Sequence, residues 1–174
     1  RCATKPPSAH WSSGTSIGNG QRDWNMVGPN SGDNIAIVET LPLSGQWFAA
    51  DYAGATYAAK LSDSSDLLGV FEVTNDALLL RGVASPMDGF TKTELTYSPP
   101  IPVLSFPLTS QKSWQVTSSV TGYAQGVFGT YTEAYDFLAD ASGTLETPFG
   151  TFDVLRVRST LTRTVGFAVT TIRS

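Results

Sequence analysis

The chain has 174 residues, of which 41% are hydrophobic, and a net charge of −4. This length suits one domain with a sizeable apolar core. Nucleic acid is not an expected partner, because the few basic residues are scattered and a phosphate backbone needs a basic stripe that releases counterions. No apolar run approaches the roughly 18 residues that a membrane helix needs, so we expect no transmembrane segment.

Residues 1–34 are rich in Gly, Ser, Asn and Pro and lack a hydrophobic period. We therefore expect an irregular N-terminal arm, followed by one antiparallel β domain at residues 35–174. Turn residues divide the next part of the chain into expected short strands at 34–40, 54–61, 67–73, 77–83 and 91–98. The prolines of 99–107 force extended backbone. We expect an edge connection there, with a boundary between two sub-structures as the alternative.

The last third of the chain carries the clearest pattern. Strands are expected at 115–122 and 129–138, and Pro148-Phe149-Gly150 marks a tight hairpin. From Val154 to Ile172, apolar residues alternate with Arg and Thr, which is typical of one long strand or two joined strands with one dry face. The expected dry face consists of Leu155, Val157, Leu161, Val165, Phe167 and Val169. No segment shows sustained helical spacing, so we predict an all-β protein with little helix, built as an antiparallel curved sheet, half-barrel or sandwich.

Two phrases in this region resemble a known group of proteins. Phe106-Pro107-Leu108 and Lys112-Ser113-Trp114 are followed, some thirty residues later, by 147–157 with its Pro-Phe-Gly turn and Val-Leu-Arg-Val strand. Over about residues 95–170 the chain resembles uncharacterised secreted or periplasmic bacterial proteins, some of which look like half-barrels related in shape to lipoprotein carriers. The resemblance implies a curved sheet that holds an apolar ligand, and it brings no catalytic residues.

Two charged residues fall on strand faces that are otherwise apolar. Glu133 falls on the same strand face as Tyr131, Tyr135 and Phe137. Arg163 lies on the apolar face of the last strand pattern. Burying either charge alone is costly, so the two should pair, reach solvent or meet a ligand. On a curved sheet both can point into the hollow, where they would suit a polar head group above an apolar cavity. An ion pair at the end of a sheet, or a solvent-exposed face, is the alternative.

The sequence gives little support for a metal site or for a catalytic nucleophile. His10 is the single histidine and Cys2 the single cysteine, which argues against a zinc site and against a Ser-His-Asp triad. Cys2 is expected to be a free thiol or to pair with a cysteine outside this chain. Asp63 with Asp66, and the Asn/Asp cluster at 30–34, form loops without a recognisable calcium pattern. We expect no metal and no cofactor.

Carbohydrate chemistry is a weaker hypothesis. Glu133 and Asp136 lie three apart on one strand and so face opposite sides, which argues against them as a glycosidase pair. Aromatic side chains can stack on sugars, but most tryptophans pack in cores with their N–H bonded. The chain has four tryptophans: Trp11, Trp24, Trp47 and Trp114.

The two ends of the chain and its composition indicate where in or outside the cell the protein is located. The chain begins at Arg1 without methionine, which favours removal of an export signal, with trimming of the sequence as the alternative. Charged residues make up only 15%, and Ser and Thr fill polar positions, a bias that accompanies extracytoplasmic proteins. The strand pattern of 170–174 stops without a turn, so we expect the natural polypeptide to continue. Together these features favour a periplasmic, cell-surface or secreted protein.

These observations lead to one main expectation about function. We expect a non-catalytic, exported bacterial protein that binds a small apolar or amphipathic ligand, or an envelope protein, on its curved sheet. The expected ligand-binding residues are Tyr131, Glu133, Tyr135 and Arg163. A carrier of this kind needs a cavity lined by Tyr131, Tyr135, Leu155 and Val157. A structural or adhesive surface module is the first alternative, and a polysaccharide hydrolase the second.

Overall fold

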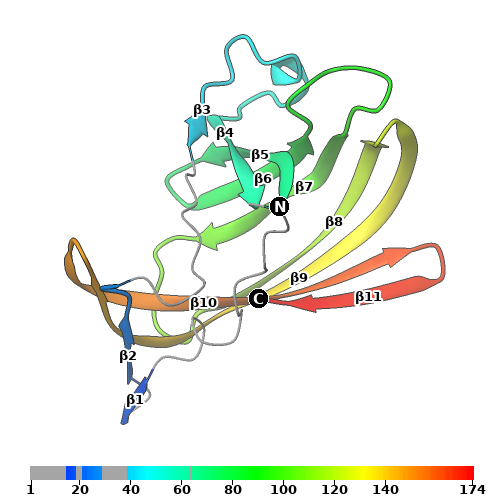
Figure 1. Ribbon diagram of the computed structural model, residues 1–174. Coiled ribbons are helices and arrows are strands. Elements are labelled where there is room, and N and C mark those ends of the chain that lie inside the picture. The colour runs from blue at the N-terminus through cyan, green and yellow to red at the C-terminus, as the bar shows by residue number, and fades with distance from the viewer. Residues whose placement is uncertain (1–14, 19–20, 29–38, 63) are drawn as a thin grey trace. The chain divides into compact units, whose positions relative to one another are not determined.

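The computed structural model describes residues 15–18, 21–28, 39–62 and 64–174. These residues form strands and a 3-10 turn, which confirms the prediction of an all-β protein with little helix (Figure 1). The elements are β1 (Thr15–Gly18), β2 (Gln21–Asn25), β3 (Thr40–Leu41), η1 (Ala49–Asp51), β4 (Tyr57–Ser62), β5 (Ser65–Val73), β6 (Ala77–Ala84), β7 (Glu94–Ser105), β8 (Ser113–Ala124), β9 (Val127–Thr147), β10 (Gly150–Val165) and β11 (Ala168–Arg173). The expectations for Cys2, His10, Trp11, Asp63 and the cluster at 30–34, and most of the strand expected at 34–40, fall on residues outside the described ranges.

The strands join in one sheet of order β1-β2-β9-β8-β7-β6-β5-β4-β3, with β10 beside β9 and β11 beside β10. Successive strands from β3 to β8 pair antiparallel, as short connections require. β2 instead pairs parallel with β9, Gln21–Asn25 against Ser142–Glu146. The sheet is therefore mixed. β1 and β2 also lie within residues 1–34. An irregular arm was expected there, because the polar sequence of that segment has no period-two alternation that would indicate a strand.

The described residues form two compact units. The smaller one contains residues 15–18, 21–28, 108–112 and 138–158, and the larger one contains residues 39–62, 64–107, 113–137 and 159–174. In the smaller unit, Arg156 donates two hydrogen bonds, of 2.8 and 2.7 Å, to the two carboxylate oxygens of Asp140. This contact lowers the pKa of Asp140 below its usual value, more than burial raises it. The expected ligand-binding residues all belong to the larger unit.

The prolines after Ser98 lie within a strand, so the expected edge connection is wrong. β6 and β7 pair at Gly82↔Thr96 and again at Leu80↔Ile101, which leaves residues 97–100 bulged opposite Arg81. Proline lacks an N–H and is tolerated at bulges, where no ladder hydrogen bond is needed. β7 consequently runs through the proline segment and keeps β6 as its neighbour.

The end of the chain forms two joined strands, β10 and β11, that pair antiparallel. Leu155, Val157 and Leu161 are half-buried, but so are Arg156, Thr160 and Thr162 on the other face, so burial does not distinguish the expected dry face. The same expectation is wrong for three others, since Val165, Phe167 and Val169 are 50%, 108% and 64% exposed. The chain turns at Gly166, which has a φ of +58°, so Phe167 stands in the turn. β11 then runs along the surface with all of its residues exposed.

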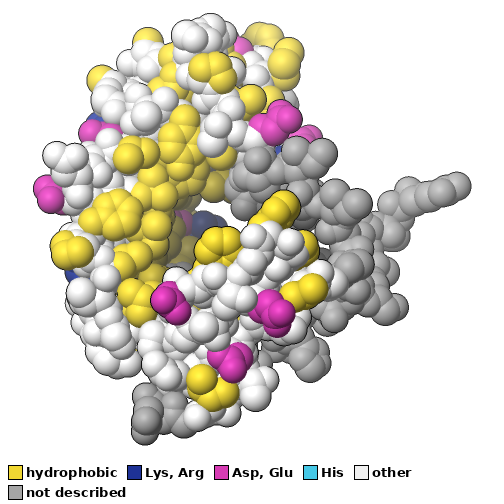
Figure 2. Space-filling view, turned by 90° about the vertical axis from the view of Figure 1, so that its left-hand side faces the viewer, with side chains coloured by type: hydrophobic (Ala, Val, Ile, Leu, Met, Phe, Trp, Pro, Cys, Tyr) yellow, Lys and Arg dark blue, Asp and Glu magenta, His cyan; other side chains and the backbone are white. Residues whose placement is uncertain are grey.

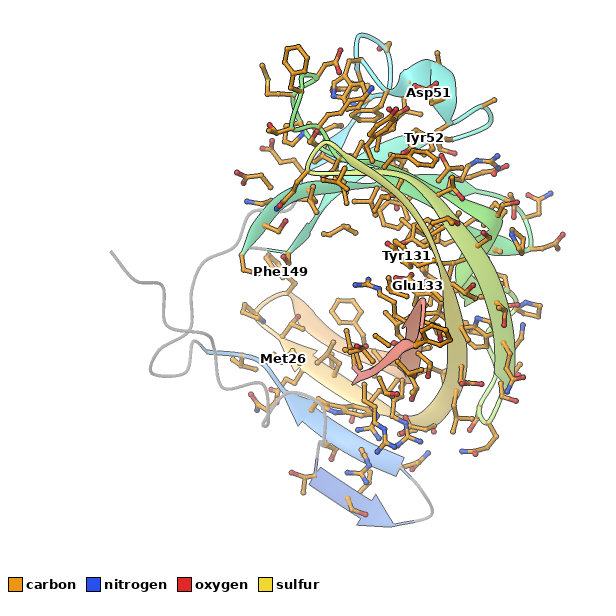
Figure 3. All side chains as sticks on the ribbon, turned by 90° about the vertical axis from the view of Figure 1, so that its right-hand side faces the viewer. Met26, Asp51, Tyr52, Tyr131, Glu133 and Phe149 are labelled. Carbon is orange, nitrogen blue, oxygen red and sulfur yellow. The ribbon has the colours of Figure 1, made fainter. Side chains whose placement is uncertain are left out.

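One face of the sheet in the larger unit is covered by the segment that precedes β4. Its core consists of Phe48, Tyr52, Ala58, Leu68, Val70 and Ala84. The hydroxyl of Tyr52 donates to the Leu95 carbonyl at 2.9 Å, and burial raises its pKa well above the usual tyrosine range. A Cβ on Gly82 would lie 2.1 Å from the Tyr52 ring, so only glycine permits this approach. Figure 3 shows Tyr52 on one side of the strands, with Tyr131 and Glu133 on the other.

Candidate functional site

The face opposite Tyr52 carries an open groove of about 740 Å³ in the larger unit. Its walls are mainly apolar, and in the upper half of Figure 2 hydrophobic side chains gather with few charges among them. Strands β4 to β7 supply the aliphatic part of the lining, namely Leu61, Leu67, Leu80, Val83 and Leu95. These side chains share one face because antiparallel pairing sets Gly69 opposite Val83 and Val83 opposite Leu95, and Leu67 lies two residues before Gly69 on the same strand. The groove therefore follows from the register of the sheet.

A polar cluster occupies another part of the groove lining, where Tyr97, Tyr131, Tyr135 and Arg163 face the space. Beneath it lies Glu133, which is 0% exposed. Arg163 approaches one oxygen of Glu133 with Nε and Nη2, each at 2.7 Å, and Tyr135 donates its hydroxyl to the other oxygen at 2.8 Å. The guanidinium also lies over the Tyr131 ring, 5.2 Å from its centroid.

Burial and the ion pair fix the protonation of this cluster. Burial raises the pKa of Tyr97 and Tyr135 above the usual tyrosine range, and the carboxylate of Glu133 raises both further. The pKa of Tyr131 is raised for the same reasons. Burial opposes the charge of Arg163, but the hydrogen bond and attraction of Glu133 outweigh it, so the pKa of Arg163 is also raised. The tyrosines remain neutral hydroxyls, and Arg163 remains a cation.

This geometry suits recognition better than proton transfer. Glu133 accepts hydrogen bonds at both oxygens and is closed to solvent, so it is not placed to exchange a proton with a substrate. Asp136 is exposed while Glu133 is buried, as expected for opposite faces of one strand. The side chain of Arg163 is 41% exposed, which makes it the charged group of this pair that a ligand can reach.

The structure brings together the four residues to which the sequence pointed. Tyr131, Glu133 and Tyr135 come from β9 and Arg163 from β10, so the pairing of the two charges is now observed. Of the four residues expected around a cavity, Tyr131 and Tyr135 line the groove. Leu155 instead lines a separate depression of about 630 Å³ in the smaller unit, and the expectation that it lines the groove is wrong.

The aliphatic walls from β4 to β7 were missed by the sequence analysis. These strands carry apolar residues on both faces, so alternation does not reveal which face stays open. Leu68 and Val70 belong to the covered core, whereas their neighbour Leu67 lines the groove. The covering segment with Phe48 decides between the faces, and it shows no periodic signal of its own.

The remaining candidates have structural roles where they are described. Trp47 donates its indole N–H to the Ser85 carbonyl at 3.0 Å, and Trp114 donates to the Pro102 carbonyl at 2.7 Å. Trp24 is 8% exposed. Asp66 pairs with Lys60 at 3.3 Å. Within the described ranges, no three His, Cys, Asp or Glu residues are arranged to hold a metal ion.

Comparison with known proteins assigns this chain to no family. No protein-family model, no curated protein and no solved structure matches this chain. Among residues 15–18, 21–28, 39–62 and 64–174, no helix has the length and apolar character to cross a membrane. The functional argument therefore rests on the groove and its polar cluster.

Proposed function

We propose that this protein is a non-catalytic binder of a small amphipathic molecule, held in the groove of the larger unit. The observation that carries the proposal is an apolar groove in which one exposed cation, Arg163, is set among tyrosines. The apolar part of the ligand would lie against the aliphatic residues of β4 to β7. Its polar part would take hydrogen bonds from Arg163 and from the neighbouring tyrosine hydroxyls.

Size and lining support a small ligand. A volume of about 740 Å³ falls within the range of about 300–1,000 Å³ that is typical of small-molecule sites. Such sites are mainly apolar and use a few placed polar groups for orientation. The groove combines aliphatic walls such as Leu67 and Leu80 with the polar cluster around Arg163, and further polar side chains such as Asp66 and Gln125 complete its lining.

Hydrogen-bonding capacity restricts the head group. A guanidinium offers donors and no acceptor, so the ligand should present an oxygen acceptor such as a carboxylate, phosphate or carbonyl. Glu133 already neutralises the charge of Arg163. This favours a head group that carries little net charge, or one that accepts hydrogen bonds from Arg163 while Glu133 stays bound to it. The low content of charged residues, 15%, supports an extracytoplasmic setting.

Titration with a fluorescent fatty acid, a dansylated undecanoate, tests the proposal. The wild type should bind the probe saturably with a blue-shifted emission, because the dansyl group enters an apolar site. Leu61→Lys places a charge on the groove wall at a side chain that is 45% exposed, and it should weaken binding at least tenfold. Val73→Lys is the matched control, because Val73 is 54% exposed on a neighbouring strand and is not part of the lining.

The two variants separate the possible results. The proposal holds if Leu61→Lys loses affinity while Val73→Lys stays within twofold of the wild type. Absence of saturable binding to the wild type would overturn it. Equal loss in both variants would also overturn it, because the probe would then be reporting general surface hydrophobicity.

A further inference from the structure

A loop and a neighbouring turn of the larger unit carry large apolar side chains that are mostly exposed to solvent. Met87 and Phe90, in the loop between β6 and β7, are 77% and 102% exposed. Val127 and Phe128, the first two residues of β9 after its turn from β8, are 72% and 61% exposed. We call these four residues the apolar tip; the loop and the turn appear at the upper right of Figure 1.

The loop and the turn are held together by backbone contacts. The N–H of Gly126 donates to the Lys92 carbonyl at 2.8 Å. The N–H of Gln125 donates to Thr93 Oγ1 at 3.1 Å. Gly126 has a φ of +81°, and a Cβ there would lie 2.1 Å from the Phe90 carbonyl oxygen. The loop and the turn are therefore joined, and one structural unit carries the exposed side chains of both.

The same two segments form part of the groove. Pro86 and Thr91 of the loop, and Ala124 and Gln125 of the turn, belong to its lining. The loop and the turn that carry the apolar tip thus also line this end of the groove. A surface that contacts the tip would therefore lie close to this end of the groove.

Charge at the tip is sparse and not positive. Lys92 lies 2.8 Å from Glu94 and 3.7 Å from Asp88, so one cation is more than offset by two carboxylates. The pKa of Lys92 is raised, first by its hydrogen bond to Glu94, so the lysine stays charged within this pair. A surface that binds this tip therefore needs no net charge of its own, and contact with it should depend little on salt.

The size of the tip argues for a lipid surface over a protein. Four side chains of this kind offer roughly 500 Å² of apolar area, with each aromatic ring contributing about 200 Å². A stable protein interface buries about 800 Å² on each partner and requires matching shape. Apolar side chains on narrow turns instead suit a fluid apolar phase, which needs no fixed complement.

We propose that the apolar tip inserts into the surface of a lipid bilayer, so that the groove exchanges its amphipathic ligand with the membrane. The exchange rests on the proposed function, whereas the docking of the tip stands on its own. Docking would place this end of the groove close to the bilayer, where amphipathic molecules are concentrated.

Flotation with uncharged phosphatidylcholine vesicles tests the docking. The wild-type chain should float with the vesicles to the same extent at low and high salt. Phe90→Ser/Val127→Ser should lower the partition coefficient at least tenfold, because two inserted side chains become polar. Phe167→Ser is the matched control, since Phe167 is 108% exposed in the turn between β10 and β11, and it should remain within twofold of the wild type.

Independent readouts keep the two proposals apart. Circular dichroism must show that the variants are folded, and Met87→Ser/Phe128→Ser provides a second pair with the same expected loss. Docking is overturned if the wild type does not float, if both pairs float like the wild type, or if Phe167→Ser loses flotation equally. Flotation only with vesicles that carry membrane proteins would overturn it in favour of a protein partner. The Phe90→Ser/Val127→Ser variant should still bind the dansylated probe in solution, whereas a wild type that floats without binding the probe would reject only the groove.

Discussion

Replacing Arg163 by methionine removes the cation that faces Glu133 and keeps most of the aliphatic stem. In the wild type, Glu133 is 0% exposed and Arg163 lies 2.7 Å from its oxygen. The variant leaves a buried carboxylate with only the Tyr135 hydroxyl as a partner. We expect this change to destabilise the larger unit strongly, because a buried charge without a counter-charge is costly.

The magnitude follows from the burial of each partner. Removing one member of a fully buried ion pair costs about 3–5 kcal/mol. Water reaches this pair through the Arg163 side chain, which is 41% exposed, so we discount the cost to about 2–3 kcal/mol. For a chain of this size, 1 kcal/mol shifts the melting temperature by about 2–4 °C, so Arg163→Met should melt about 5–10 °C below the wild type.

A double-mutant cycle provides the assay. Urea unfolding at pH 7 would compare the wild type, Arg163→Met, Glu133→Gln and the double variant. Glutamine keeps an oxygen for Tyr135, so the double variant should lie only about 1 kcal/mol below the wild type. The coupling between the two positions should then exceed about 1 kcal/mol. If the double variant is no more stable than Arg163→Met, Glu133 does not depend on Arg163 and the reasoning fails.

Two further predictions concern packing and pH. Gly82→Ala should lower the free energy of unfolding by about 2–3 kcal/mol, because its Cβ would lie 2.3 Å from the Leu95 carbonyl oxygen, whereas Gly129→Ala, with open space around it, should change it little in the same urea titration. Asp140 has its pKa lowered by Arg156, so its contribution is present above the unfolded pKa of about 4 and is lost as pH falls below it. Asp140→Asn should therefore lower stability at pH 7 and flatten its decline between pH 4 and pH 2; an unchanged acid profile would contradict this.

The strands and the polar cluster could be predicted from the sequence because each depends on local alternation. Glu133 stands out as a charge between tyrosines, and Arg163 as a charge between apolar residues, so their pairing could be anticipated. The same logic failed at Phe167, where a turn at Gly166 interrupts the alternation. Alternation of apolar and polar residues assigns side chains to one face of the sheet only within a single uninterrupted strand.

The groove and the apolar tip depend on contacts between distant segments, which alternation does not encode. Whether Leu67 or Leu68 faces open space is decided by the covering segment with Phe48, far away in the sequence. The loop that carries Phe90 and the turn before Val127 are joined by the hydrogen bond from the Gly126 N–H to the Lys92 carbonyl. In the sequence, each of these apolar residues looks like an ordinary core residue near a turn.

Native mass spectrometry of the full chain from its natural source tests the central claim most directly. The spectrum should show a non-covalent mass excess of one small molecule, which is lost on denaturation and reveals the class of the ligand. The excess should be missing from Leu61→Lys, whose groove wall carries a charge, and should persist in Val73→Lys. A wild-type spectrum without any excess, or an equal excess in both variants, would contradict the account.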